Sequence, residues 1–174
     1  MSQPKIVLIQ GSLSANSKTA LTLAVTQELL EKKGAKVELV DLHKVKMEFC
    51  DGRELKDYSQ DLQQAYKTMS EADAYVVGMP VYCYSVSGPL KNFLDITCKA
   101  MAGKPVGVVC SAGGMGSYLA SADLLKILGY EVEAIGVHPV VYAWSQDFAD
   151  GKITNPKVTE KIEAMATKLL SLVK

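Results

Sequence analysis

Short runs of branched apolar residues recur along the chain, separated by longer segments with a different apolar pattern. Residues 6–9 form the first run, and a continuous apolar run is typical of a strand buried on both faces of a parallel sheet. The other predicted strands cover residues 37–40, 74–78, 104–110 and 132–141. The last of these should be broken or bent near Pro139, because proline is tolerated only at sheet edges or irregular positions.

Between the strands, apolar residues recur every three or four positions, which is the spacing of one face of a helix. Segments with this pattern cover residues 21–30, 62–69, 88–101, 117–128 and 156–169. Gly34 and Gly129 should end the first and fourth helices, and Asn155 should cap the fifth. Residues 42–58 are charged and irregular, and we expect a lid or an interface element there.

Five alternating strands and helices predict an α/β fold in which an open parallel sheet lies between two helix layers. This architecture is a three-layer α/β/α sandwich with a five-stranded sheet. The 174 residues are enough for one such core and too few to divide comfortably into two. We therefore expect residues 1–174 to form a single domain.

The charge of the chain is balanced, with 19 Lys and Arg residues against 19 Asp and Glu residues. A neutral chain has no global field that would attract nucleic acid or an anionic membrane, so neither partner is expected. The apolar run at residues 6–9 is too short for a signal-peptide core or a membrane span, which predicts a cytoplasmic location.

The cysteines and histidines predict no metal site. The four cysteines are Cys50, Cys83, Cys98 and Cys110, and they lie at least 12 positions apart. This spacing excludes the C-x-x-C pair on which zinc and iron–sulfur sites are usually built. His43 and His138 are isolated from each other and from any acidic pair at a ligand-like spacing.

The segment after the first predicted strand reads Q-G-S-L-S-A-N-S-K-T, and its last eight residues resemble the phosphate loop G-x-x-x-x-G-K-[ST]. Ser12 and Ser17 stand where that loop has glycines. The free N–H groups at a helix start favour an anion, and hydroxyl and amide side chains add further donors. We expect this loop to bind a phosphomonoester through Ser12, Ser14, Asn16, Ser17 and Thr19. The alternative is ordinary helix capping, but one cap needs only one such side chain.

Two other phosphate-binding classes do not match the sequence. A nucleoside triphosphatase needs a carboxylate at a strand end to hold Mg²⁺, and the third and fourth predicted strands end without one. A dinucleotide fingerprint G-x-G-x-x-G is missing after the first strand, and residues 114–116 supply only a partial match after the fourth. Dinucleotide binding of the Rossmann type is therefore not expected.

Two further loops follow the third and fourth predicted strands. In an open parallel sheet, ligands bind beyond the carboxyl ends of the strands, where these loops meet the first. The second loop supplies Pro80, Val81, Tyr82, Cys83, Tyr84 and Ser85, and the third supplies Ser111, Ala112, Gly113 and Gly114. A planar heterocycle is expected to lie on the tyrosine segment and to take N–H groups from both loops, because glycines permit close approach. The alternative is that the tyrosines only cover the end of the sheet.

Three motifs together resemble those of the NADPH-dependent FMN reductases, which belong to the flavodoxin-like superfamily and include azoreductases and quinone or chromate reductases. The motifs are G-S-L-S-A-N-S-K-T, M-P-V-Y-C-Y-S-V-S-G-P-L-K-N-F-L-D and S-A-G-G-M-G. The resemblance covers nearly the whole chain. It implies a flavodoxin-like fold with strand order 2-1-3-4-5, FMN as cofactor and NADPH or NADH as electron donor. Many members carry an arginine where this chain has Ser14.

The resemblance also implies roles for the three loops. The first loop would hold the FMN phosphate, with Lys18 nearby. Residues 80–85 would line the ribityl chain and the isoalloxazine ring, and residues 111–114 would meet the pyrimidine side of the ring. A homodimer or homotetramer is implied too, with residues 42–58 and the aromatic Tyr142, Trp144 and Phe148 as candidate interface residues. The alternative for these aromatics is packing under the last helix.

The resulting prediction is an enzyme that transfers hydride from the nicotinamide to flavin N5 and then reduces a second molecule by a ping-pong scheme. Flavin, quinone, azo compounds and metal oxyanions are the candidate acceptors, and no side chain is predicted to act as a catalyst. The alternative is a non-enzymatic FMN electron carrier of the flavodoxin type. Such carriers are commonly strongly acidic, whereas this chain has a formal net charge of zero.

Overall fold

The computed structural model describes residues 3–173. The parallel strands are β1 (Lys5–Gln10), β2 (Lys36–Asp41), β3 (Ala74–Tyr82), β5 (Pro105–Ala112) and β6 (Ile135–Trp144). The α-helices are α1 (Lys18–Lys32), α2 (Gln60–Ser70), α3 (Gly88–Thr97), α4 (Ser121–Val132) and α5 (Pro156–Ser171). Short strands are β4 (Ser85–Val86), β7 (Phe148–Ala149) and β8 (Lys152–Ile153), and 3-10 turns are η1 (Leu55–Asp57), η2 (Cys98–Met101), η3 (Met115–Ala120) and η4 (Ser145–Asp147).

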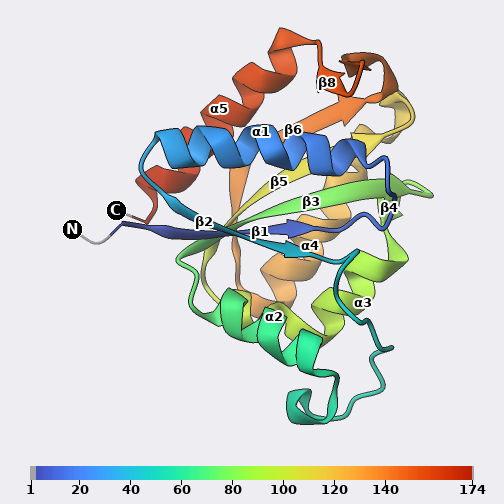
Figure 1. Cartoon of the computed structure of the whole chain (residues 1–174), viewed down its shortest axis with the longest axis vertical. Helices are drawn as coiled ribbons and strands as arrows, with labels where there is room; N and C mark the ends of the chain where they lie inside the picture. Colours follow the sequence, from blue (N-terminus) through green and yellow to red (C-terminus); the bar gives the residue numbers. More distant parts are fainter. Residues whose placement is uncertain (1–2, 174) are drawn as a thin grey trace.

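The main sheet has the order β2-β1-β3-β5-β6, with every neighbouring pair parallel. Counting only these five long strands, the order is 2-1-3-4-5, so the predicted flavodoxin-like architecture is confirmed. The short β4 pairs antiparallel with the end of β3. Helices α1 and α5 cover one face of the sheet, and α2, α3 and α4 cover the other (Figure 1).

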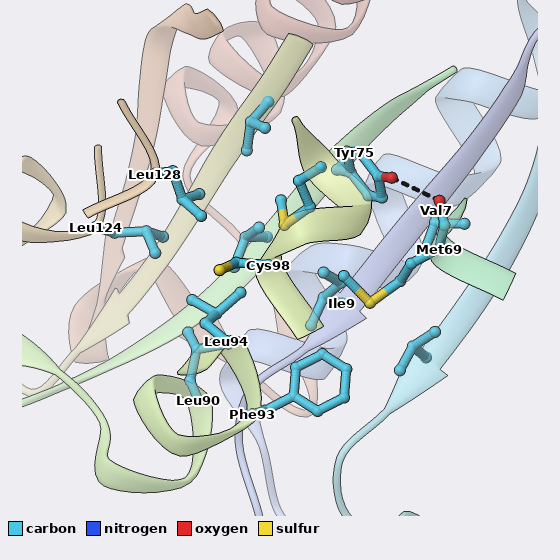
Figure 2. Packing of buried hydrophobic residues seen from close by; sticks show 14 of the residues in the cluster. Val7, Ile9, Met69, Tyr75, Leu90, Phe93, Leu94, Cys98, Leu124 and Leu128 are labelled. Atoms are coloured by element: carbon cyan, nitrogen blue, oxygen red, sulfur yellow. Dashed lines mark hydrogen bonds between the residues drawn. The ribbon is translucent and has the colours of Figure 1, made fainter. Parts of the chain in front are cut away.

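Each face of the sheet has its own apolar core, because successive side chains of a strand point to opposite faces. Val7 and Ile9 of β1 lie in the core beneath α2, α3 and α4, whereas Ile6 and Leu8 lie in the core beneath α1 and α5. Figure 2 shows the first of these cores, where the Tyr75 hydroxyl donates a hydrogen bond to the Met69 carbonyl. Burial on both faces explains why β1 reads as an uninterrupted apolar run.

Helix α5 illustrates how the helix layers are fixed. Asn155 caps it by accepting the Lys157 N–H at 3.1 Å, as predicted, and Pro156 occupies its first turn. Its buried residues recur at helical spacing and face the sheet. In the range 3–173, no helix combines the length and the apolar content that crossing a membrane requires.

The prediction for α4 was wrong at both ends. Met115–Ala120 forms a 3-10 turn rather than the start of the helix, and Gly129 lies inside α4 instead of ending it. Burial of Leu128 and Val132 supports the last turn despite the poor helix propensity of glycine. Glu133 ends the helix with a left-handed backbone at φ 52°. The next strand therefore begins at Ile135 and not at the predicted residue 132.

The structure can also be compared with the predictions for the end of β3, for Pro139 and for residues 42–58. Strand β3 continues past residue 78 to Tyr82, because β5 pairs alongside it as far as Pro80 and β4 pairs with its last two residues. The expected irregularity at Pro139 is confirmed, since the pairing of β6 with β5 shifts register between Val137 and Val141. Residues 42–58 are irregular apart from the turn at Leu55–Asp57, and their role as a lid or interface remains a prediction.

Candidate functional site

The first loop has a fixed shape that comes from the last residue of β1. The Gln10 side chain is only 4% exposed, accepts the Ser12 N–H at 2.5 Å and donates to the Ser12 carbonyl at 2.7 Å. The Gly11 N–H donates to the Gly78 carbonyl of β3 at 2.9 Å. These bonds hold the start of the loop against the sheet through backbone and buried groups alone.

The hydroxyls of the first loop accept hydrogen bonds from the loop itself. Ser12 Oγ accepts the Ser14 N–H at 3.2 Å, and Ser14 Oγ accepts the Asn16 N–H at 3.3 Å. Ser17 is the N-cap of α1, because its Oγ accepts the Ala20 N–H at 3.0 Å. A hydroxyl that accepts a hydrogen bond keeps its own proton to donate. Capping therefore explains Ser17 in part, and all three hydroxyls can still act as donors to an anion.

A cavity of about 220 Å³ brings the three loops together at the carboxyl edge of the sheet. Its lining consists of Ser12, Ser14, Asn16, Ser17, Lys18, Thr19, Pro80, Val81, Tyr82, Ser111, Ala112, Gly113 and Ser145. Of the predicted site residues, Cys83, Tyr84, Ser85 and Gly114 lie outside this lining. Ser145 was missed by the sequence analysis, although it directly follows the fifth parallel strand and so could have been found by the strand-end rule.

The second loop ends in a tight hairpin. Cys83 and Tyr84 connect β3 to β4 with φ values of 50° and 60°, the left-handed conformation that a type I′ hairpin turn requires at both positions and that side chains other than glycine disfavour. Ser85 Oγ donates to the Asp123 carboxylate of α4 at 2.7 Å, and this hydrogen bond is the main cause that lowers the pKa of Asp123. Ser85 thus holds the hairpin against α4.

Strand β5 runs on to Ala112, two residues beyond the predicted end, so Ser111 lies at the end of the strand and not in the third loop, and its buried hydroxyl has no partner in the described residues. Ser111 Oγ makes no hydrogen bond to any group in residues 3–173, although the residue lines the 220 Å³ cavity. Leaving such a group unsatisfied costs about 1–3 kcal/mol, so native proteins rarely keep one without a use. The neighbouring Gly114 carbonyl accepts a hydrogen bond from the Tyr142 hydroxyl, which also pairs with Ser117 Oγ at 2.9 Å.

These groups fit the chemistry of FMN. The first loop offers hydroxyl donors and a helix N-terminus to a phosphate, and Ser111 offers a hydroxyl to a polar chain. A Cβ built on Gly113 or Gly114 would meet no atom within 4 Å, so the backbone there is open to a planar ring. Among residues 3–173, no group of three potential metal ligands is found.

A second cavity, of about 660 Å³, lies beyond the first loop. Its lining comes from the first loop, the end of β2 and the hairpin between β7 and β8, and consists of Gln10, Ser14, Ala15, Asn16, Ser17, Lys18, Ala20, Leu21, Asp41, His43, Phe148, Ala149, Asp150 and Gly151. No motif in the sequence indicated this cavity. Ser14, Asn16, Ser17 and Lys18 line both cavities, so the first loop separates them.

Known proteins resemble this chain in sequence and in fold. The family model for NADPH-dependent FMN reductase matches residues 4–149. The NAD(P)H-dependent FAD/FMN reductase of Geobacillus thermodenitrificans is 32% identical over 97% of this chain and 92% of its own length. The NADH-dependent FMN reductase SfnF of Pseudomonas putida is 29% identical over 91% of this chain and 87% of its own length. The solved flavoenzyme NAD(P)H:(acceptor) oxidoreductase of Paracoccus denitrificans shares the fold with a TM-score of 0.76 at 21% identity, covering 97% of this chain and 98% of that one.

The likeness to the Geobacillus thermodenitrificans reductase extends over nearly the whole sequence, and the region matched by the family model, residues 4–149, includes all three loops of the site. The resemblance predicted from the loop motifs is thereby confirmed. The chain belongs to the NADPH-dependent FMN reductase family.

Proposed function

We propose that the chain is a flavoenzyme in which FMN carries electrons from NAD(P)H to a small-molecule acceptor. Family membership supports both the enzyme class and the cofactor. The structural observation that carries the proposal is Ser111 Oγ, a buried hydroxyl without a partner in the described residues, in a cavity that all three loops line. A polar chain running from a phosphate to a ring would satisfy that hydroxyl.

The roles of the first loop follow from its geometry. Ser12, Ser14 and Ser17 donate hydrogen bonds from their hydroxyls to the terminal phosphate, and the N-terminal amides of α1 add the attraction of the helix dipole. Asn16 and Lys18 line the same cavity and add an amide and a positive charge. Thr19 lies in the first turn of α1, lines the same cavity and adds a further hydroxyl for the phosphate.

The second and third loops hold the rest of the cofactor. Pro80, Val81 and Tyr82 line the cavity, with the hairpin 83–85 beside them, and Ser111, Ala112 and Gly113 line it as well, with Gly114 next in the chain. Bound FMN supplies the hydride and electron chemistry at its ring. Backbone N–H groups of the glycines would stabilise negative charge that develops on the ring, so we assign no catalytic side chain.

The acceptor and the order of events belong to this proposal as well. Tyr82 and Tyr84 are 54% and 71% exposed beside the cavity, which leaves an open face where donor and acceptor can bind in turn, as in a ping-pong scheme. Relatives named as a quinone oxidoreductase and an azoreductase support a small-molecule acceptor.

We also propose that residues 1–174 form one domain and that the protein is a homodimer or homotetramer. We propose a cytoplasmic location as well, because the four free thiols suit a reducing compartment.

Turnover tests the proposed function directly. The FMN-loaded protein should oxidise NADH or NADPH with a quinone or ferricyanide faster than free FMN does at the same concentration, because the chain orients both reactants. The rate is followed at steady state by the loss of dinucleotide absorbance, with the flavin-free protein as control. A rate no higher than that of free FMN would contradict the enzyme and favour an electron carrier.

Ser111→Ala should act in opposite directions on stability and on cofactor binding. Without FMN, the variant should match or exceed the thermal stability of the wild type, because alanine removes a buried hydroxyl that has no partner within residues 3–173. FMN affinity should fall about fivefold or more, since the cofactor loses a hydrogen bond worth about 1 kcal/mol or more. Calorimetry and flavin fluorescence measure the two effects.

Ser70→Ala is the matched control for Ser111→Ala, because Ser70 Oγ donates to the Tyr66 carbonyl on α2, away from the cavity. This control should leave FMN affinity unchanged. A Ser111→Ala protein that loses stability without FMN, or that binds FMN as tightly as the wild type does, would show that the hydroxyl serves the fold and not the cofactor.

A further inference from the structure

Apart from the first-loop residues that it shares with the FMN site, the 660 Å³ cavity beyond that loop has no role in FMN binding as proposed above. Its volume falls within the range of about 300–1,000 Å³ that is typical of small-molecule sites. It lies at the same carboxyl edge of the sheet as the FMN site, between the end of β2 and the β7–β8 hairpin, which Figure 1 shows above α1. A molecule in this cavity would therefore be separated from the FMN phosphate only by the first loop.

One polar group in the cavity is suited to a sugar diol. Asp41 is the last residue of β2 and pairs in register with Gln10, the residue that fixes the first loop. Its Oδ1 accepts the His43 N–H at 3.1 Å, its Oδ2 lies 3.9 Å from the exposed Lys44 ammonium, and its side chain is 18% exposed. A carboxylate has about four acceptor positions, so Asp41 can accept further hydrogen bonds. In dinucleotide-binding folds, an acidic residue about 20 residues beyond the first loop accepts the ribose hydroxyls of adenosine.

The opposite part of the lining is apolar. Ala15 and Leu21 belong to the first loop and α1, and Phe148 belongs to β7. The Lys18 ammonium lies 5.6 Å from the centre of the Phe148 ring, which keeps the lysine stem along this wall. A flat, uncharged base can lie against such a surface, while its sugar reaches the carboxylate.

The charge of the lining favours a ribose with free hydroxyls over a ribose that carries a 2′-phosphate. Asp41 and Asp150 are acidic, Lys18 is the single lysine of the lining, and no arginine is part of it. With His43 counted as neutral, the lining has a formal charge of −1, and the Lys44 ammonium, which pairs with Asp41 from outside the lining, offsets part of this charge. A ribose with free hydroxyls suits this charge, whereas a 2′-phosphate would bring further negative charge beside Asp41.

We propose that this cavity binds the adenosine half of the dinucleotide donor, with Asp41 accepting the ribose hydroxyls, so that the enzyme favours NADH over NADPH. The inference rests on the proposed function, because it assumes a dinucleotide donor. It does not require the Rossmann fingerprint, since the first loop is assigned to the FMN phosphate and only the adenosine enters the cavity.

Binding of ADP-ribose tests the inference without turnover. Calorimetry on the FMN-loaded protein should detect ADP-ribose binding, and the 2′-phosphorylated analogue should bind about tenfold more weakly. Asp41→Asn should weaken ADP-ribose binding about tenfold, because hydrogen bonds to a charged acceptor are roughly twice as strong as neutral ones, and it should reduce the discrimination against the 2′-phosphate. The asparagine keeps an oxygen that can accept the His43 N–H, so the local turn is preserved.

Asp61→Asn is the matched control, since the Asp61 carboxylate also accepts a backbone N–H, from Lys46 at 2.8 Å, and lies outside the cavity. This control should bind ADP-ribose as the wild type does. In wild-type kinetics, kcat/KM should be higher for NADH, and ADP-ribose should compete with NADH.

The outcomes separate the inference from the proposed function. A protein that oxidises NADH but fails to bind ADP-ribose overturns the inference and leaves the flavoenzyme standing. Binding that Asp41→Asn leaves unchanged, or that does not compete with NADH, also overturns it. Asp41-dependent binding of ADP-ribose by a protein without turnover would support the cavity as an adenosine site and count against the proposed reaction.

Discussion

Gly11→Ala is expected to lower the free energy of unfolding by about 2 kcal/mol or more, because it overpacks a buried turn. A Cβ at this position would lie 2.7 Å from the Gly78 carbonyl oxygen and 3.0 Å from Leu90 Cδ2. The carbonyl belongs to the central strand β3 and accepts the Gly11 N–H, so it cannot move without disturbing the sheet. Urea unfolding of the protein without FMN measures the loss.

Gly88→Ala provides the matched control for that substitution. A Cβ at Gly88 would meet no atom within 4 Å, and the residue begins α3. Alanine there should leave stability unchanged or raise it by about 0.4–1 kcal/mol, because it restricts the unfolded chain. If Gly11→Ala and Gly88→Ala unfold at the same urea concentration, the close approach of the first loop to β3 is not what requires glycine.

The second large effect is expected for the double variant Ser12→Ala, Ser17→Ala, whose dissociation constant for FMN should rise about 100-fold or more. Each serine is assigned one hydrogen bond to a charged phosphate, and such a bond contributes about 1.5–3 kcal/mol. Titration of the FMN-free protein with FMN, followed by quenching of the flavin fluorescence, measures the change.

Stability must be separated from binding in this experiment, because Ser17 also caps α1 and its loss costs about 1 kcal/mol by itself. Ser59→Ala removes a cap of the same kind, since Ser59 Oγ accepts the Leu62 N–H at the start of α2, and it also removes the hydrogen bond that Ser59 Oγ donates to the Lys46 carbonyl. That control should lose similar stability and keep its FMN. Equal loss of flavin in both proteins, or unchanged affinity in the double variant, would refute the phosphate assignment.

The fold could be predicted because its main signals are local. Strands β1 and β5 are buried along nearly their full length, which requires the continuous apolar runs found at those positions. The helices carry their pattern and, for α5, the capping residues as well. The end of α4 could not be predicted from Gly129, because the burial of Leu128 and Val132 depends on tertiary packing that local propensity does not contain.

Of the site, only the first loop could be predicted from the sequence alone, because several binding signals coincide within it. The first loop holds its serines within six residues and lies just before a helix, so its anion chemistry is visible in the sequence. The hairpin at Cys83 and Tyr84 lacks the glycine or asparagine that is typical of such a turn, so it could not be predicted from the sequence. The second cavity joins Asp41 to Phe148, residues that are far apart in the chain and meet only through the order of the strands.

The two hydrogen bonds between the Gln10 side chain and the Ser12 backbone affect the rate of cofactor exchange. Because the start of the loop is held by buried bonds within the chain, its conformational entropy is lost when the protein folds and not when FMN arrives. Association then needs no ordering of this turn. A loop that already has its binding shape lets FMN leave one molecule and enter another while both remain folded. The same loop can therefore serve a resident cofactor or a flavin that is released after each cycle.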